Sequence, residues 1–432
     1  MSEDQFDFDV TVVGAGVAGA VTAYLLAQKG LSVALIDRGE TPGSKNLSGG
    51  VLYCRSMTTV FPDFFDQAPY ERRISRNQLV FMTPESSVAL DYADERLHRG
   101  GTAVTVLRAK LDAWLAERCE EAGVMVMPGT RVDGLRIDQG RVVGVRAGED
   151  ELNCRVVVAA DGVNSFLCRD AGLRPKPASN QLALGVKAVV KLPDGQLESR
   201  FGLAPDHGAA LALVGDCTQG VGGGGFLYTN RDSCSVGLVL RLDDLVRQGL
   251  RSVDLFDHLL AHPLLERYLA DGQLVEYGCH LVAEGGRAMR GQIVHNGLVV
   301  VGDAAGLTIN TGFTVRGMDL AVGSAIAAAE AVAAAIAADD VSAAGLAPYE
   351  TALDQSYVGQ DMRTFAKAPH FMEGDRLYHD YGPLLADILF QIYHLDTSPR
   401  HRLMKVARSA LKASPLRLTQ LARDGWEGVR AL

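Results

Sequence analysis

The chain has 432 residues, is 47% hydrophobic and 22% charged, and has a formal net charge of −10 at pH 7. This length suits two or three domains with a sizeable core, and the acidic balance argues against nucleic acid as a partner. The seven cysteines are scattered without a C-x-x-C pair, so no zinc or iron–sulfur ligand set is visible and no metal is expected. The acidic, polar N-terminus is unlike a secretory signal, and we expect a cytoplasmic protein.

The first predicted element is a buried strand over residues 10–13, followed by a glycine-rich turn and a helix. Gly14, Gly16 and Gly19 match G-x-G-x-x-G. In this motif the first glycine permits the turn, the second lets backbone approach a pyrophosphate, and the third lets the helix pack on the strand. The first helical turn, which includes Ala18, offers free N–H groups and a positive dipole end to phosphate.

A second predicted strand over residues 32–36 ends at Asp37 and Arg38. Asp37 lies where a carboxylate accepts hydrogen bonds from a ribose diol in dinucleotide-binding proteins. The strand, the glycine turn, the helix and this acid together predict a dinucleotide site.

The loop that follows, residues 43–53, is polar and rich in glycine. Its position after the ribose-binding strand favours contact with the bound dinucleotide. Its backbone amides could form an anion nest around the pyrophosphate. A solvated turn is the alternative. The candidate cofactor-binding residues here are Ser44, Lys45, Asn46, Ser48, Gly49 and Gly50.

Further along, residues 103–125 show the apolar spacing of an amphipathic helix, and alternation after residue 125 predicts a small meander. Residues 181–245 alternate as antiparallel strands do. Residues 254–272 and the chain after Pro348 have helical patterns.

Two more apolar strands end in glycine and aspartate. Residues 154–165 reach Asp161 and Gly162, and residues 298–306 reach Gly302 and Asp303. These segments, in this order after the N-terminal motif, resemble the flavoprotein hydroxylase and reductase superfamily. That resemblance implies FAD as the cofactor, and implies that Asp303 bonds its ribityl chain.

The expected fold is therefore α/β. A Rossmann-type FAD-binding domain, p-hydroxybenzoate hydroxylase/glutathione reductase-like, is joined to an antiparallel-sheet substrate domain and a C-terminal helical region. We assign the discontinuous FAD-binding domain to residues 1–75, 96–178 and 287–345. The substrate domain takes residues 76–95 and 179–286, and the helical region takes residues 346–432.

Several longer segments narrow the family. They are GSKNLSGGVLY from residue 43, GGGGFLYTN from 222, TINTGFTVRGMDL from 308 and YVGQDMRTFAKAPHF from 357. Together they resemble the electron-transfer flavoprotein–quinone oxidoreductase family, and within it the short FixC-type members. The resemblance runs from about residue 8 to the C-terminus and adds Arg108 as a candidate for the pyrophosphate.

This resemblance implies a FAD-dependent oxidoreductase that passes electrons between an electron-transfer flavoprotein and a ferredoxin-like or quinone acceptor. Long members carry a ferredoxin-like domain with a cysteine cluster, but this chain has no cysteine after Cys279. Any iron–sulfur relay is then a separate ferredoxin-like protein or is absent. If it is absent, the alternative is a stand-alone flavin oxidoreductase that acts on a small-molecule substrate in a biosynthetic pathway.

The segment after Asp303 is expected to face the flavin ring. Asn310, Thr311 and Gly312 would open the following helix toward the pyrimidine, with Gly312 and Phe313 against the cofactor. No catalytic acid or base is evident. The candidates are Arg316, which lies over the flavin or is a surface charge, and His370, a proton donor or an ordinary packed or exposed histidine. No second dinucleotide motif is present, so stable NAD(P)H binding is not expected.

The tail, residues 397–432, holds eight Lys or Arg against two acids. One hypothesis is a solvated helix face that packs on the FAD-binding domain. The other is a docking surface for an acidic ferredoxin or an anionic membrane. Residues 321–338 are apolar but alanine-rich, which favours a buried helix over a membrane span. At most we expect peripheral contact with the inner face of the membrane.

Overall fold

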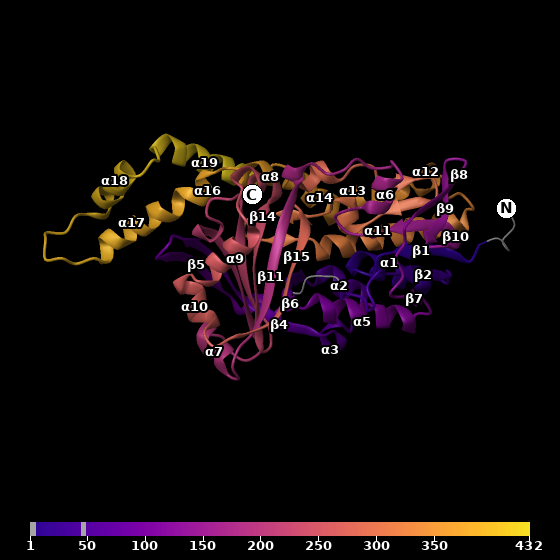
Figure 1. The fold of residues 1–432 in the computed structure, drawn as a ribbon, viewed down its shortest axis with the longest axis horizontal. Helices are drawn as coiled ribbons and strands as arrows, with labels where there is room; N and C mark the ends of the chain where they lie inside the picture. Colours follow the sequence, from indigo (N-terminus) through magenta and orange to yellow (C-terminus); the bar gives the residue numbers. More distant parts are fainter. Residues whose placement is uncertain (1–5, 45–48) are drawn as a thin grey trace.

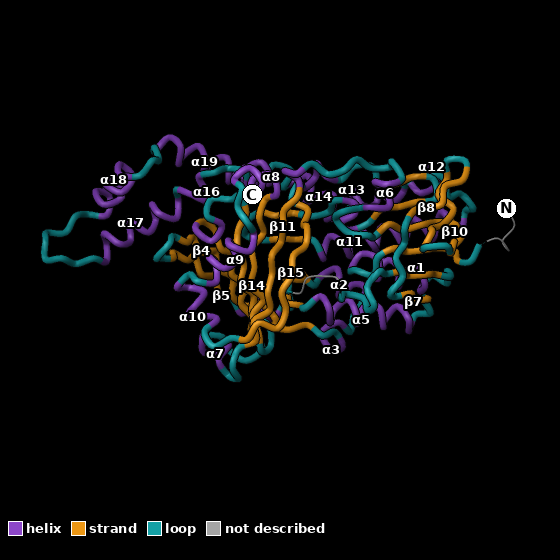
Figure 2. The backbone as a smooth tube through the Cα atoms, in the orientation of Figure 1, coloured by secondary structure: helices purple, strands orange, loops and turns teal. Residues whose placement is uncertain are grey.

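The computed structural model describes residues 6–44 and 49–432, and it contains two large sheets side by side along the long axis (Figures 1 and 2). The N-terminal motif belongs to the first sheet. Its main path runs β16 (Val294–His295), β17 (Leu298–Val300), β10 (Asp150–Ala159), β1 (Phe8–Val13), β2 (Val33–Ile36) and β7 (Met125–Met127).

The centre of this first sheet is parallel and buried. β1 pairs in parallel with both β2 and β10, so that Val12 lies between Leu35 and Val158. β10 and β17 are also parallel. Continuous apolar runs are typical of such strands because helices cover both faces. β8 (Gly134–Asp138) and β9 (Arg141–Ala147) extend β10 as an antiparallel meander.

Two apolar helices pack on this sheet. They are α1 (Val17–Gln28), which follows the glycine turn, and α11 (Met318–Ala337), and the two helices contact each other. By length and composition α11 could cross a membrane, but fourteen of its 20 residues are buried within the protein. It is thus a core helix here, as its alanine content predicted. α5 (Arg108–Glu121) contacts α1 as well.

The second sheet forms the wall opposite the glycine turn. Its main path runs β15 (Gln273–Ala283), β11 (Leu182–Lys191), β14 (Ser233–Arg241), β13 (Gly223–Thr229), β12 (His207–Gly215), β4 (Tyr70–Met82), β6 (Ala103–Val106) and β3 (Gly50–Tyr53), with β5 (Ser87–Ala93) beside β4. Its pairings are antiparallel except for β4 with β12. α9 (Ser252–Leu260) and α10 (Pro263–Leu269) bury Leu255, Leu259 and Leu265 in its core.

The helix expected across residues 103–125 is shorter than predicted. Residues Ala103–Val106 pair with β3 and β4 as strand β6, and the helix begins only at Arg108. An apolar run of four residues has no periodicity of its own, so long-range pairing decided its conformation. β3 and β6 come from segments that we assigned to the FAD-binding domain, and the domain limits remain our interpretation.

Short helices connect these layers. They are α2 (Arg55–Val60), α3 (Phe64–Gln67), α4 (Glu95–Arg99), α6 (Phe166–Asp170), α7 (Gln196–Phe201) and α8 (Leu242–Gln248). The chain after α11 is helical, as predicted: α12 (Ala343–Leu346), α13 (Pro348–Gln355), α14 (Tyr357–Thr364), α15 (Ala368–Met372), α16 (Arg376–His379), α17 (Tyr381–Tyr393), α18 (Leu403–Ala413) and α19 (Leu418–Ala431).

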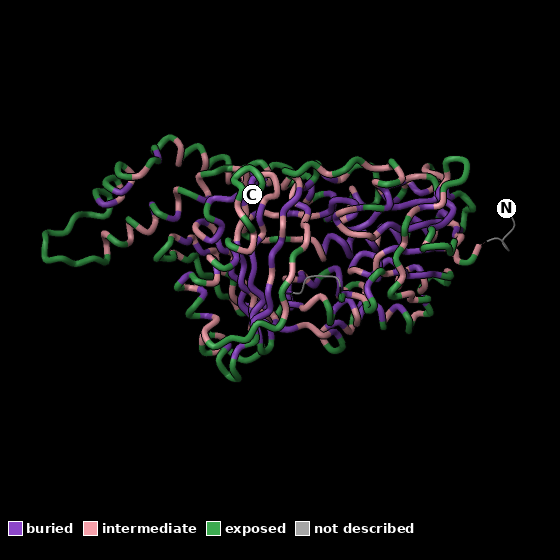
Figure 3. The backbone as a smooth tube through the Cα atoms, viewed as in Figure 1, coloured by how far each residue is buried: buried purple, intermediate pink, exposed green. Residues whose placement is uncertain are grey.

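The last helices differ from the rest in exposure. α17, α18 and their connecting loop, which we call the C-terminal arm, extend away from the two sheets, and α19 runs back toward them (Figure 1). Figure 3 shows buried backbone concentrated in the sheets and mostly exposed backbone along this arm. Phe390, Tyr393, Leu403 and Met404 are exposed there.

Candidate cofactor and acceptor site

A cavity of about 900 Å³ lies between the two sheets. One side is made by the turns that follow β1, β2, β10 and β17, where parallel strands end. The other side is a face of the second sheet, with residues from β4, β12, β13, β11 and β15. Ligands bind at this edge in open α/β sheets because the loops there enclose a crevice.

The three motif glycines have three different surroundings. A Cβ on Gly14, whose φ is +105°, would lie 2.3 Å from the Ala160 carbonyl oxygen, and a Cβ on Gly19 would lie 1.9 Å from the Gly14 oxygen. Both positions require glycine for internal packing. A Cβ on Gly16 would meet only the Arg108 guanidinium, at 3.4 Å. Gly16 therefore faces open cavity at the first turn of α1, whose N–H groups have no intrahelical partner.

Asp37 lines the cavity and also orders its own turn. One carboxylate oxygen accepts from the Ala15 N–H at 2.9 Å, and the other accepts from the Gly39 N–H at 2.7 Å. Arg38, Gly49 and Gly50 line the cavity nearby. The carboxylate thus links the end of β2 to the glycine turn.

Arg108 is held against the glycine turn by Asp112. Its guanidinium donates two hydrogen bonds to that carboxylate, at 2.9 and 2.8 Å, and the Asp112 side chain is fully buried. A bidentate ion pair of this kind fixes the plane of the guanidinium. The Arg108 cation therefore lies beside Gly16, where it can contact a bound pyrophosphate.

Asp303 and Lys187 extend this charged end of the cavity. Burial raises the pKa of Asp303, while the charges of Arg108, His280 and Lys187 oppose that rise. Burial also lowers the pKa of Lys187 from 10.5 to about 8, with the charge of Arg108 adding to the effect. The Lys187 ammonium lies 5.6 Å from the centre of the Phe226 ring.

Asp161 supplies a polar atom that lacks a partner. Its Oδ2 accepts from the Leu167 N–H at 3.0 Å, whereas Oδ1 is buried with no hydrogen-bond partner among the described residues. Burial raises the pKa of this carboxyl. Gly162 follows with φ +77° and has no atom near its Cβ position. An unsatisfied acceptor next to open space suits a ligand hydroxyl.

The segment after Asp303 is a hairpin, so our prediction that Asn310–Gly312 begins the next helix is wrong. β18 (Ile309–Asn310) pairs with β19 (Val315–Arg316), and Gly312 turns the chain with φ +75°. The Thr311 N–H donates to the Thr314 oxygen and closes the turn. α11 begins only at Met318, after Gly317, and its first turn faces the cavity beside Asp303.

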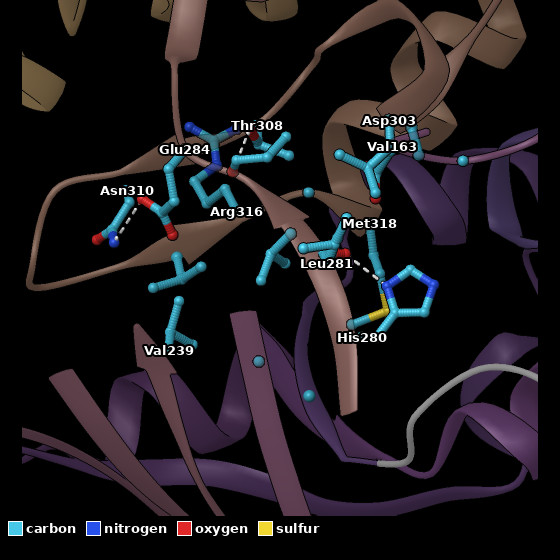
Figure 4. A pocket seen from close by; sticks show the side chains of 18 of the residues that line it. Val163, Val239, His280, Leu281, Glu284, Asp303, Thr308, Asn310, Arg316 and Met318 are labelled. Atoms are coloured by element: carbon cyan, nitrogen blue, oxygen red, sulfur yellow. Dashed lines mark hydrogen bonds between the residues drawn. The ribbon is translucent and has the colours of Figure 1, made fainter. Parts of the chain in front are cut away.

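Arg316 lies in the cavity wall rather than free on the surface. It donates to Asp319 at 2.6 and 2.8 Å and to Asp361 at 2.6 Å. These pairs hold the start of α11 against α14. Figure 4 shows the Arg316 side chain beside Glu284, with Asn310 on the other side of that carboxyl.

Glu284 is a cavity residue that the sequence analysis missed. It follows β15, and its Oε2 accepts from the Asn310 Nδ2 at 3.2 Å. Burial raises its pKa to about 7, against the smaller effect of the Asn310 hydrogen bond. Lys187 was missed as well. In each case a charged residue within or just after an apolar strand was the available signal.

Most of the predicted site residues line the same cavity. The cavity is lined by Gly14, Gly16, Ala18, Asp37, Arg38, Gly49, Gly50, Arg108, Asp161, Gly162, Asp303, Gly312, Phe313 and Arg316. Gly19, Ser44 and Gly302 lie outside the described lining. His370 also lies outside it, because its side chain is 92% exposed beside Glu373. Lys45, Asn46 and Ser48 fall outside the described residues.

Comparisons with known proteins agree with this geometry. Residues 7–206 match the model of the FAD binding domain, and residues 368–432 match that of the ETF-QO/FixC family C-terminal domain. The chain belongs to the ETF-QO/FixC family. It is 43% identical to the probable electron transfer flavoprotein-quinone oxidoreductase YdiS of Escherichia coli K12 and 40% identical to protein FixC of Salmonella typhi. Each match covers 100% of both chains.

Solved structures show the same fold at low identity. A geranylgeranyl bacteriochlorophyll reductase-like protein from Thermoplasma acidophilum superimposes with a TM-score of 0.68 at 19% identity, covering 96% of this chain and 98% of that one. The flavin-dependent brominase Bmp2 gives 0.64 at 17% identity, covering 94% and 98%. The expected fold class, with its Rossmann-type FAD-binding part, is confirmed.

The protein is an FAD-dependent electron-transfer oxidoreductase, as the family membership shows. Its cavity fits FAD on three independent features: the open face of Gly16, the cation of Arg108 beside it, and the unsatisfied Oδ1 of Asp161. The first turn of α1 and Arg108 would hold the pyrophosphate. The hairpin and the start of α11 would face the ring.

Proposed function

We propose that the chain accepts electrons from an electron-transfer flavoprotein and passes them through FAD to a lipophilic quinone. The names of its relatives support the electron-transfer chemistry. The observation that favours a quinone is a second apolar space next to the cofactor cavity.

This second space, the tail groove, has a volume of about 520 Å³. It is lined by Phe313, Phe371, Tyr381, Leu421, Asp424, Gly425, Gly428, Val429 and Leu432. Phe313, Phe371 and Leu432 line the main cavity too, so the two spaces share a wall. An apolar groove that adjoins the cofactor cavity suits a ligand with a redox head and a long hydrocarbon tail.

The surface of α19 and of the C-terminal arm supports a location at the inner face of the membrane. Trp426 and Val429 on α19 are exposed, as are Leu403 and Met404 on α18. Basic residues lie among these apolar ones: Arg400, Arg402, Lys405, Arg408 and Lys412. Apolar and basic residues on one amphipathic helix are typical of binding in the interface of anionic lipids.

The cofactor supplies the two-electron and one-electron chemistry when bound. The residues of this chain position it and stabilise charge. The start of α11 directs N–H groups and a positive dipole end at the cavity beside Asp303, and Lys187 and Arg108 add cations to the lining. The face of the second sheet adds an aromatic surface to the cavity, where the Phe226 and Tyr228 rings stack with their centroids 4.8 Å apart.

A ferredoxin-like protein is the second proposed protein partner. No cysteine follows Cys279 in these 432 residues, so the iron–sulfur centre in this proposal belongs to a separate ferredoxin-like protein. As an acceptor, such a partner would dock on the protein surface, whereas the quinone would approach through the tail groove.

The tail groove can be tested with Gly425→Trp, because no atom lies within 4 Å of a Cβ at this position. We expect the indole to fill the groove and raise the KM for a long-tailed quinone at least tenfold. The KM for a short-tailed, soluble quinone and the FAD content should stay unchanged. Val246→Trp, on the exposed surface of α8, is the matched control. Equal KM values for the long-tailed quinone in both variants would eliminate the groove as its route.

Membrane contact has its own test. Replacing Arg400, Arg402, Lys405 and Arg408 by glutamine should reduce binding to vesicles that contain anionic lipid. The attraction is worth about 1 kcal/mol per basic residue near such a surface, and it is screened within about 10 Å at 0.1 M salt. The loss should therefore be largest at low ionic strength, with FAD content unchanged. Equal vesicle binding by the two proteins at low salt would leave α18 as a helix that only packs.

A stand-alone oxidoreductase acting on a small molecule is the second candidate. The observation that favours it is that Lys187 and Glu284 both line a cavity whose surface is mostly apolar, a pattern typical of small-molecule sites. Reduction of neither long-tailed nor short-tailed quinones by the dithionite-reduced protein would favour this candidate over the first.

A further inference from the structure

A quinone that accepts two electrons also needs two protons, and the described cavity wall contains few groups that can deliver one. Of its carboxyl groups, Asp37 accepts from backbone amides and Asp303 lies near Arg108 and Lys187. Asp133 pairs with Arg131 and Asp170 with Arg169. Asp161 accepts from the Leu167 N–H and lies beside Gly14, at the glycine turn. Glu284 differs from these, because its one hydrogen-bond partner among the described side chains is the neutral amide of Asn310.

The position of Glu284 matches the ring end of the cavity. It follows β15, across from the β18–β19 hairpin and the first residues of α11, and its carboxyl is directed between Asn310 and the Val239 side (Figure 4). Asn310 is itself oriented, since its Oδ1 accepts from the Gly312 N–H at 2.9 Å. The amide therefore presents its NH2 group to Glu284 and leaves the second carboxyl oxygen facing the cavity.

The groups that face Glu284 come from three elements. Asn310 is on β18 and Arg316 is on β19. Tyr378 is on α16, and the charge of Glu284 contributes to the raised pKa of its phenol. The Arg316 guanidinium is already paired with Asp319 and Asp361.

The charge of Arg241 opposes the rise in the Tyr378 pKa, and Arg241 is itself paired with Asp243. The neighbours of Glu284 are thus either neutral or engaged elsewhere. Its pKa of about 7 follows from burial and agrees with this geometry.

We propose that Glu284 is the residue that donates a proton to the quinone oxygen during reduction, with Asn310 orienting its carboxyl. This rests on the proposed function. The electron pair comes from the bound cofactor. The Glu284 O–H bond breaks as the quinone O–H bond forms, the second proton comes from water, and Glu284 regains its proton from solvent. A donor with a pKa near the working pH is most effective in this role.

Glu284→Gln is the first test, since glutamine keeps the shape and can still accept from Asn310. We expect quinone reduction at pH 7 to fall about 100-fold, in line with the loss of a general acid. Reduction of ferricyanide, which takes one electron and no proton, should be unchanged. Glu330→Gln, on the outer face of α11, is the matched control. Glu284→Asp, which keeps the acid, should recover part of the rate.

A readout independent of turnover is the infrared band of the protonated carboxyl. In the FAD-loaded wild type a carboxylic acid C=O band should titrate near pH 7 and be missing in Glu284→Gln. Asn310→Ala leaves the carboxyl but removes the amide that donates to it, so the pKa of Glu284 should rise. The infrared titration and the fall in quinone-reduction rate at alkaline pH should then both move to higher pH. This variant keeps the proposal falsifiable if Glu284→Gln loses FAD.

His280 and Lys187 are the competing donors, because both also line the cavity. The His280 Nδ1 is bonded to the Leu281 oxygen. If the fall in rate at alkaline pH survives in Glu284→Gln and disappears in His280→Asn or Lys187→Met, the proposal is overturned while quinone reduction stands. If the wild type reduces no quinone, the proposed function itself fails, and the proton-donor role falls with it.

Discussion

The two ends of the cavity are built in opposite ways. At the phosphate end, Gly14, Gly16 and Gly19 lie within six residues, and their surroundings are set by one strand–turn–helix unit. At the ring end, Glu284 and Arg316 meet from separate segments, and Lys187 reaches Asp303 and Arg108 from the second sheet in the same way. A local motif therefore identifies the cofactor, whereas tertiary packing assembles the residues that decide what reacts with it.

The largest expected effect is on the glycine motif, where one glycine is needed for packing and another for FAD binding. Gly19→Val places a Cβ 1.9 Å from the Gly14 oxygen, and overpacking of this kind should cost more than about 3 kcal/mol of unfolding free energy. Gly16→Val instead fills open cavity, so the protein should fold but lose FAD. Thermal unfolding and the flavin absorbance of the purified variants measure the two effects. A Gly16→Val protein with full FAD would remove Gly16 from the pyrophosphate site.

The contrast between a local motif and residues assembled by tertiary packing explains which strands and site residues could be predicted from the sequence. The strands at residues 10–13, 32–36, 154–160 and 298–301 were predictable because apolar runs and glycines encode them locally. The same holds for Arg38, Asp161 and Asp303 at or near strand ends. The start of α11 was not, because the hairpin before it depends on Gly312 and on the Thr311–Thr314 hydrogen bond.

Lys187 and Glu284 were missed for a related reason. Each is a single charged residue in or beside an apolar strand, and only the pairing of β11 with β14 and β15 shows which face it occupies. His370 was a candidate by sequence, but its helix α15 leaves the imidazole in solvent. Side-chain direction at such sites is a property of the assembled sheet and not of the segment.

The next effect in size concerns Lys187 in the apoprotein. Its folded-state pKa of about 8 lies below the unfolded value of 10.5, so the unfolded chain binds more protons between these two pH values. Stability contributed by this group therefore rises with pH across the interval, on the order of 3 kcal/mol in total. Lys187→Met removes the buried charge. The variant should be more stable than wild type near pH 7, and its advantage should shrink toward pH 10.5 in urea unfolding.

That comparison also has a clear contrary outcome. A stability difference between wild type and Lys187→Met that stays constant from pH 7 to 10.5 would mean that Lys187 is solvated in the folded protein. The adjoining position Lys191, which is exposed at the end of β11, is the control for general effects of a lost lysine.

Asp303→Ala should weaken FAD without unfolding the protein. The carboxylate is expected to accept from a ribityl hydroxyl, and one charge-assisted hydrogen bond is worth about 1.5–3 kcal/mol. The Kd for FAD should therefore rise by roughly 10- to 150-fold, measured by flavin fluorescence during reconstitution. Since Asp303 also raises the pKa of Lys187, the variant should lower the pH at which that lysine loses its proton. Unaltered FAD affinity would assign the ribityl contact to another residue.

The smallest expected effect is at the helix that borders the tail groove. Asp424 on α19 accepts from the Arg376 Nε and Nη2 at 2.5 and 2.6 Å and from the Tyr381 hydroxyl. The Arg376 hydrogen bonds lower the pKa of Asp424. A depressed folded-state pKa stabilises the protein above the unfolded value near 3.8 and loses that contribution as the pH falls below it. Because Arg376 is 32% exposed, solvent screening limits the pair to about 1 kcal/mol.

Asp424→Asn should therefore lower the unfolding free energy by about 1 kcal/mol at pH 7, with the difference from wild type vanishing in acid. Loosening α19 should also increase hydrogen exchange at the backbone amides of residues 418–431 while those of α1 stay protected. The FAD content should not change, because Asp424 borders the tail groove and not the cofactor cavity. If Asp424→Asn instead lost FAD as readily as Asp303→Ala, the two ends of the cavity would be coupled through α19, and their division into a local half and an assembled half would be wrong.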